Sequence, residues 1–75
     1  MVLVKDRKKL LRQILRQARE DAKLRQIDVA ALLGVPQSYV AKVESGERKI
    51  SFIEVLDFCS AIQLDPQILI DRLSL

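Results

Sequence analysis

The chain has 75 residues, 49% of them hydrophobic and 31% charged, with two Gly and two Pro. This composition predicts one small folded domain and excludes a disordered tail. A single Cys and the absence of His exclude a disulfide framework and leave too few ligands for a zinc site, so we expect no metal, cofactor or enzyme activity. No apolar run approaches the roughly 20 residues of a membrane span, so we expect a cytoplasmic protein with no membrane partner. We expect no small-molecule ligand, because one domain of this size leaves no second domain to bind an inducer.

Positive charge is concentrated in the first two thirds of the chain. Residues 1–50 contain twelve Lys or Arg and six Asp or Glu, a net charge of +6, whereas residues 51–75 carry a net −3. The first part would therefore attract a polyanion, and the last part would not.

The spacing of apolar residues predicts an all-α fold with five helices, whose core covers about residues 6–73. The first helix is expected over residues 5–23, with its Lys and Arg on a solvated face; contact with phosphates is the alternative. The second is expected over residues 26–33 and ends at Gly34, because Gly adopts positive φ without strain. The third is expected from Pro36, a favoured first residue, to about Ser45.

Two further helix starts stand in the last third of the chain. Ser51 and Glu54 form a capping box that predicts the start of a fourth helix. Asp65 and Pro66 predict a fifth, which runs to about residue 73. The core residues expected along the fourth helix share one apolar stripe: Phe52, Val55, Leu56, Cys59 and Ile62.

Two short helices joined by about three residues, with Gly at the turn, are the sequence form of a helix-turn-helix. Ala30 has to be small, because it lies where these helices cross. With Gln26, the Leu33-Gly34-Val35 turn and the run QSYVAKVESGER at residues 37–48, the chain resembles the Cro/repressor-type (lambda repressor-like, Xre-type) helix-turn-helix regulators over about residues 11–70. The resemblance implies one five-helix domain over residues 1–75. It also implies a transcriptional regulator, expected to be a repressor, that binds the major groove of double-stranded DNA as a homodimer.

The resemblance places four residues at the base-reading face of the third helix: Gln37, Ser38, Tyr39 and Lys42. Gln pairs bidentately with adenine and Lys reaches guanine, so this chemistry suits base reading. For Tyr39, packing against the neighbouring helix is an alternative that the residues leave open.

Phosphate contacts are implied for Gln26, Arg25, Arg48 and Lys49. A solvent-exposed polar residue without this role is the alternative for Gln26. Arg19 and Glu44 match a charged pair that joins the first helix to the end of the third in similar repressors. The role expected of this pair is structural.

Three residues depart from the family pattern. Arg25 stands where Ser or Thr usually caps the second helix, which loses a cap worth about 1 kcal/mol. Pro36 stands where Ser or Thr often caps the third helix, so one phosphate contact is expected to be missing. Gln63 replaces a common Gly after the fourth helix and leaves the entry to the fifth helix open.

Apolar residues near the carboxyl end exceed what one small core needs. We expect Ile70, Leu73 and Leu75, with Ile62 or Leu64, to form a dimer interface. Packing of these residues against residues 2–4 of the same chain is the alternative.

The same module occurs in other roles. An antitoxin with a toxin as its protein partner and the controller protein of a restriction system both use it. An interaction adaptor that keeps the fold but has lost DNA binding is a third alternative, which the positive front half of the chain disfavours.

Overall fold

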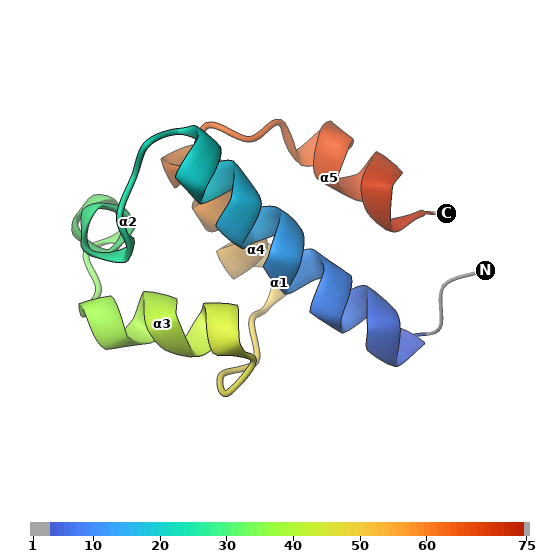
Figure 1. Ribbon diagram of the computed structural model, residues 1–75, viewed down its shortest axis with the longest axis horizontal. Helices are drawn as coiled ribbons and strands as arrows, with labels where there is room; N and C mark the ends of the chain where they lie inside the picture. The colour runs from blue at the N-terminus through green and yellow to red at the C-terminus, as the bar shows by residue number, and fades with distance from the viewer. Residues whose placement is uncertain (1–3, 75) are drawn as a thin grey trace.

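The computed structural model describes residues 4–74, with side chains from residue 7 onward, and within this range the chain forms five α-helices and no strand. The helices are α1 (Val4–Asp21), α2 (Gln26–Leu33), α3 (Gln37–Ser45), α4 (Phe52–Ala61) and α5 (Pro66–Leu73). Figure 1 shows α1 running across the middle of the molecule, with α3 along one side and α5 along the other. Across residues 4–74, every helix is too short or too polar to cross a membrane.

All five helices contribute to one core. The side chains of Leu15, Val29 and Phe58 are fully buried, and burial of each is worth roughly 1.5–3 kcal/mol. Ala30 is 2% exposed in α2, beside α3, as expected of a small residue at the crossing. The buried apolar residues are Ile14, Leu15, Val29, Ala30, Val40, Val43, Phe58, Cys59, Ile62 and Leu69.

The buried face of α4 differs from the prediction. Phe52 is 68% exposed and is not a core residue, whereas Phe58 is fully buried. The difference lies along the helix axis and not around it. Phe52 is seven residues before the buried Cys59 and so lies within about 20° of it around α4, but it is the first residue of the helix, where its ring is left uncovered. Ile62 is 2% exposed and so is a core residue, not a residue available to a dimer interface.

Two glycines end the helices of the central pair. Gly34 has φ of +69° after α2, and Gly46 has φ of +87° after α3. A side chain at Gly34 would meet no atom within 4 Å, so the backbone conformation alone explains the Gly there. These two helix ends are those that the sequence predicted.

Two residues other than Gly close helices in the same left-handed conformation. Lys23 has φ of +62° after α1, and Gln63 has φ of +59° after α4. Beyond Gln63, the Leu64 amide donates a 2.9 Å hydrogen bond to the Cys59 carbonyl, the closure normally made with Gly. The chain then enters α5 at Pro66, as predicted. The departure at Gln63 therefore changes the strain of this turn and not its path.

The helix starts agree with the sequence at α4 and α5 and differ by one residue at α3. The Ser51 hydroxyl accepts a 3.2 Å hydrogen bond from the Glu54 amide, and the Glu54 carboxylate accepts one of 3.0 Å from the Ser51 amide. Asp65 accepts from the Gln67 amide at 2.9 Å. Pro36 is the residue before α3 and not its first residue, because its ψ of 152° is extended.

Candidate nucleic-acid interface

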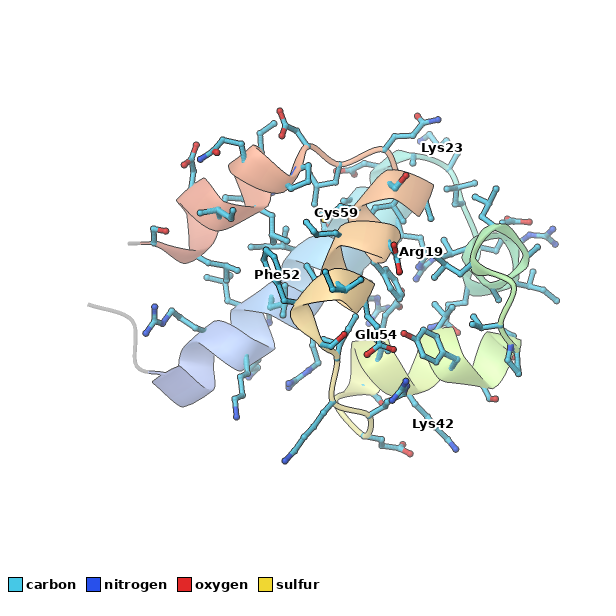
Figure 2. The ribbon with its side chains drawn as sticks, turned by 180° about the vertical axis from the view of Figure 1, so that it is seen from behind. Arg19, Lys23, Lys42, Phe52, Glu54 and Cys59 are labelled. Carbon is cyan, nitrogen blue, oxygen red and sulfur yellow. The ribbon has the colours of Figure 1, made fainter. Side chains whose placement is uncertain are left out.

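Helix α3 turns one side into the core and the other outward. Val40 and Val43 are 0% and 1% exposed. Gln37, Ser38 and Lys42 are exposed, and Figure 2 shows Lys42 extending from α3 away from the other helices. The structure thus brings three of the four predicted base-reading residues together on one accessible surface.

A buried ion pair joins α1 to the end of α3. Arg19 donates from Nε to Glu44 Oε2 at 2.7 Å and from Nη2 to Glu44 Oε1 at 3.0 Å. Its Nη1 donates to the Leu24 carbonyl at 2.8 Å. The two side chains are only 10% and 5% exposed, and the hydrogen bonds to Glu44 raise the pKa of Arg19. The charged pair expected from the sequence is therefore present, and both of its side chains are shielded from water.

The ion pair continues into a chain of amides that ends at the exposed face of α3. Glu44 Oε1 also accepts a 3.0 Å hydrogen bond from Gln26 Nε2. Gln26 Oε1 in turn accepts one of 2.9 Å from Gln37 Nε2. Gln26 is therefore half-buried and bonded on both sides, and it orients the first residue of α3.

Arg25, the residue that replaces the usual cap of α2, makes no capping hydrogen bond with its side chain. The helix start is instead closed by Asp28, whose carboxylate accepts a 2.7 Å hydrogen bond from the Arg25 backbone amide. The Arg25 guanidinium also donates to Asp28, at 3.0 and 2.9 Å. These bonds, the guanidinium ones first, lower the pKa of Asp28. The Arg25 side chain is 78% exposed but already carries an acidic partner.

Tyr39 lies apart from the other predicted base readers. Its ring stacks on Phe58, with centroids 6.5 Å apart, and its hydroxyl donates a 2.7 Å hydrogen bond to Glu54 Oε2. Burial is the main cause of the raised pKa of Tyr39. The base-reading prediction for Tyr39 is replaced by its alternative, packing against the neighbouring helix, because the ring and the hydroxyl are both directed toward α4.

Arg48 also turns toward α4. Its guanidinium lies over the Tyr39 ring, 4.6 Å from the centroid, and its Nη2 donates to Glu54 Oε2 at 2.8 Å. Glu54 thus binds Tyr39, Arg48 and Ser51. The hydrogen bonds from Tyr39 and then Ser51, with a smaller effect of the Arg48 charge, lower its pKa to about 2. The sequence showed Glu54 only as part of a capping box, so this cluster was missed. Lys49 is exposed and forms no ion pair among the described residues.

The described part of the chain offers no evident metal site, since no three His, Cys, Asp or Glu side chains gather there. The thiol of Cys59 is buried in the core, and burial raises its pKa. It is a packing group, as the apolar stripe of α4 indicated.

The residues expected at a dimer interface are separated by the structure. Ile70 is 45% exposed on α5, whereas Leu64 and Leu73 pack partly against the core. Leu75 and residues 2–3 lie outside the described residues. Ile70 is thus the described member of the predicted set that presents a large apolar surface.

The comparison with protein families decides what this arrangement is. The helix-turn-helix family matches residues 15–69, which make up more than half of the chain. The chain belongs to the XRE-type helix-turn-helix family. Members of this family are DNA-binding transcription regulators, and the five helices have the lambda repressor-like arrangement that the sequence predicted.

Solved structures agree with the family assignment. An XRE-family like protein from Pseudomonas syringae pv. tomato str. DC3000 is 41% identical over 93% of this chain and 85% of its own, with a TM-score of 0.90. The restriction-modification controller protein C.AhdI from Aeromonas hydrophila is 35% identical over 87% of this chain and 97% of its own, with a TM-score of 0.74. The comparison with curated proteins found no significant match.

Proposed function

We propose that this XRE-type protein is a sequence-specific regulator that binds double-stranded DNA through the major groove and represses transcription as a homodimer. The observation that carries the proposal is the division of α3. Val40 and Val43 fix the helix to the core, while Gln37, Ser38 and Lys42 stay exposed on the far side. An α-helix fits the major groove, and short polar side chains on its outward face meet base edges there.

The hydrogen bonds around Gln26 suggest which base Gln37 reads. Gln26 directs its amide nitrogen to Glu44, because its oxygen would be repelled by a carboxylate, so its oxygen faces Gln37. Gln37 must therefore give one N–H to Gln26 and keeps its Oε1 and a second N–H free. One acceptor beside one donor complements N6 and N7 of adenine and does not complement guanine, which presents two acceptors.

Phosphate contacts complete the interface. We assign them to Gln26 and Arg25 at the start of α2, where backbone amides also point outward, and to Lys49 and Arg48 after α3. Arg25 and Arg48 keep their acidic partners in the free protein. Both side chains remain accessible, at 78% and 42% exposed, so a phosphate can be added to the existing pair.

We expect a homodimer because a single recognition helix contacts only a few base pairs. Two copies related by a twofold axis would bind half-sites about 34 Å apart and multiply their discrimination. Ile70, at 45% exposed, is the described residue on which this interface is proposed to centre. Sedimentation of the wild-type protein and of Ile70→Glu at micromolar concentration tests this part. A wild-type monomer would remove the dimer from the proposal.

Selection of bound duplexes from a random pool tests DNA recognition itself. The wild type should enrich a sequence with adenine at a fixed position, and Gln37→Ala with Lys42→Ala should relax that choice while the unfolding temperature stays unchanged. Arg7→Ala with Gln13→Ala is the matched control, since it removes a cation and an amide from exposed positions of α1. Failure of the wild type to enrich any sequence would contradict the proposal and favour an interaction adaptor.

The role of restriction controller is a second candidate, favoured by the likeness to C.AhdI over nearly all of that protein's length. The two roles use the same surface and differ in the promoter that is bound. Selection of bound fragments from the source genome separates them, because a controller should enrich fragments beside a restriction gene. An antitoxin role would instead enrich fragments beside a toxin gene.

A further inference from the structure

A basic hollow of about 390 Å³ lies between the amino-terminal half of α1 and the loop after α3. Four cations line it: Lys8 and Arg12 from α1, and Arg48 and Lys49 from the loop. Among the side chains that the structure describes, from residue 7 onward, no Asp or Glu is part of the lining. Lys8 stands one helical turn before Arg12, so both point to the same side of α1.

Arg12 lies in this hollow because Gly46 has no side chain to occupy the same space. The Arg12 Cζ and Nε atoms lie 2.8 and 2.9 Å from the position that a Gly46 Cβ would take, so any larger residue would displace the guanidinium. Arg12 is half-buried, and no carboxylate of the described residues pairs with it. Arg48 differs, because Glu54 already binds it. Of the four cations that line the hollow, Arg12, Lys8 and Lys49 therefore lack an acidic partner among the described residues.

The hollow lies at the opposite end of α3 from Gln26. Gln26 bonds to Gln37 at the first residue of α3, whereas Gly46 follows its last residue. A helix of nine residues spans about 13.5 Å, close to the roughly 12 Å width of the major groove. When such a helix lies across the groove, a phosphate backbone flanks each of its ends.

We propose that Arg12 and Lys8 of α1 bind, together with Lys49, a backbone phosphate of double-stranded DNA at the carboxyl-terminal end of α3. This site rests on the proposed function, which already assigns Lys49 and Arg48 there, and adds two cations of α1 to it. A guanidinium already held against Gly46 loses little freedom on binding, and its planar N–H groups match two phosphate oxygens. The hollow and the start of α2 then hold the two strands on either side of the recognition helix.

The salt dependence of DNA binding tests this site. The probe is a labelled duplex selected by the wild-type protein, with an unselected duplex of mixed sequence as the second arm. Arg12→Gln should make the slope of log affinity against log salt shallower on both duplexes, by up to about 0.9, the change for one completely lost phosphate contact. Lys8→Gln, at an exposed position that the fold does not need, should act in the same direction.

Arg7→Gln is the matched control, because Arg7 is an exposed residue of the same helix about 140° around from Arg12. It removes the same charge and should leave the slope unchanged. Single methylphosphonates along the duplex then locate the contact. Neutralising one phosphate at the groove edge should weaken the wild type several-fold and weaken Arg12→Gln less, because Lys8 and Lys49 alone then contact that phosphate.

The outcomes distinguish a failure of the phosphate site from a failure of the proposed DNA-binding function. A wild type that selects a sequence, with Arg12→Gln and Lys8→Gln giving the slope of Arg7→Gln, would overturn the phosphate site and leave the proposed function intact. A wild type that binds no duplex would overturn both. Shallower slopes with an unchanged selected sequence would support the site as a backbone contact, because phosphate contacts carry no base information.

Discussion

The Tyr39 hydroxyl donates a 2.7 Å hydrogen bond to Glu54 and so ties the recognition helix to the first turn of α4. The same carboxylate accepts from the Ser51 amide at 3.0 Å and from Arg48 at 2.8 Å. One ionised group thus sets the position of α3, of the loop after it and of the start of α4. The orientation of the proposed base-reading face therefore depends on the charge of Glu54.

Stability should fall in acid through Glu54. The pKa of its carboxyl is about 2 in the folded protein against 4.5 for the unperturbed group. Between these pH values the unfolded chain binds a proton that the folded chain does not, so the free energy of unfolding decreases as the pH falls from 4.5 to 2. Urea unfolding at successive pH values measures this decrease.

Glu54→Gln should flatten the acid dependence, since the amide does not titrate. Asp57→Asn is the control, because it removes an exposed carboxylate of the same helix that forms no hydrogen bond or ion pair with Tyr39 or Arg48. An acid dependence in Glu54→Gln as steep as that of the wild type would show that other carboxylates cause it.

The Arg19–Glu44 pair should matter more to folding than any surface contact. Arg19→Met leaves the Glu44 carboxylate, only 5% exposed, without its cation, and loss of one partner of a buried pair costs about 3–5 kcal/mol. Arg19→Met with Glu44→Leu should recover part of that loss, because no unpaired charge stays buried. Chemical unfolding of the two variants measures the difference. A single variant as stable as the wild type would mean that water reaches Glu44.

Much of the fold was predictable because it rests on local signals. The capping box at Ser51, the Pro66 start and the Gly34 turn each act within a few residues, and the sequence located them all. Phe52 shows where this fails. A stripe in the sequence gives the apolar positions of a helix, but how far along the helix that stripe is covered depends on neighbouring helices.

The site was predictable in its outward residues and not in its contacts. Gln37 and Lys42 follow from a helix whose inward residues are known. The stacking of Arg48 on Tyr39 does not, because it depends on how closely the loop returns toward α4. The sequence likewise gives no sign that Arg12 differs from the other solvated cations of α1, because its contact with Gly46 depends on how α1 packs against the end of α3.

Arg48 and Lys49 should respond differently to the same substitution. Lys49→Gln should leave stability unchanged within about 0.5 kcal/mol and make the salt slope of DNA binding shallower by about 0.9. Arg48→Gln should weaken DNA binding and also lower the unfolding temperature, because it removes the cation bonded to Glu54 and stacked on Tyr39. Salt titrations and thermal unfolding of both variants give the comparison. Equal stability of the two would contradict a structural role for Arg48.

Gln63→Gly should stabilise the protein. Gln63 holds φ of +59° after α4, and this left-handed conformation costs a residue with a side chain roughly 1–2 kcal/mol. Gly removes that strain but adds freedom to the unfolded chain, so the net gain should be about 0.5–1 kcal/mol. For a domain of this size the unfolding temperature should rise by about 2–8 °C.

Gln17→Gly, the same replacement at an exposed position inside α1, should instead destabilise by about 1 kcal/mol. Thermal unfolding should therefore move in opposite directions for the two variants, and a loss of stability in both would show that Gln63 is not strained.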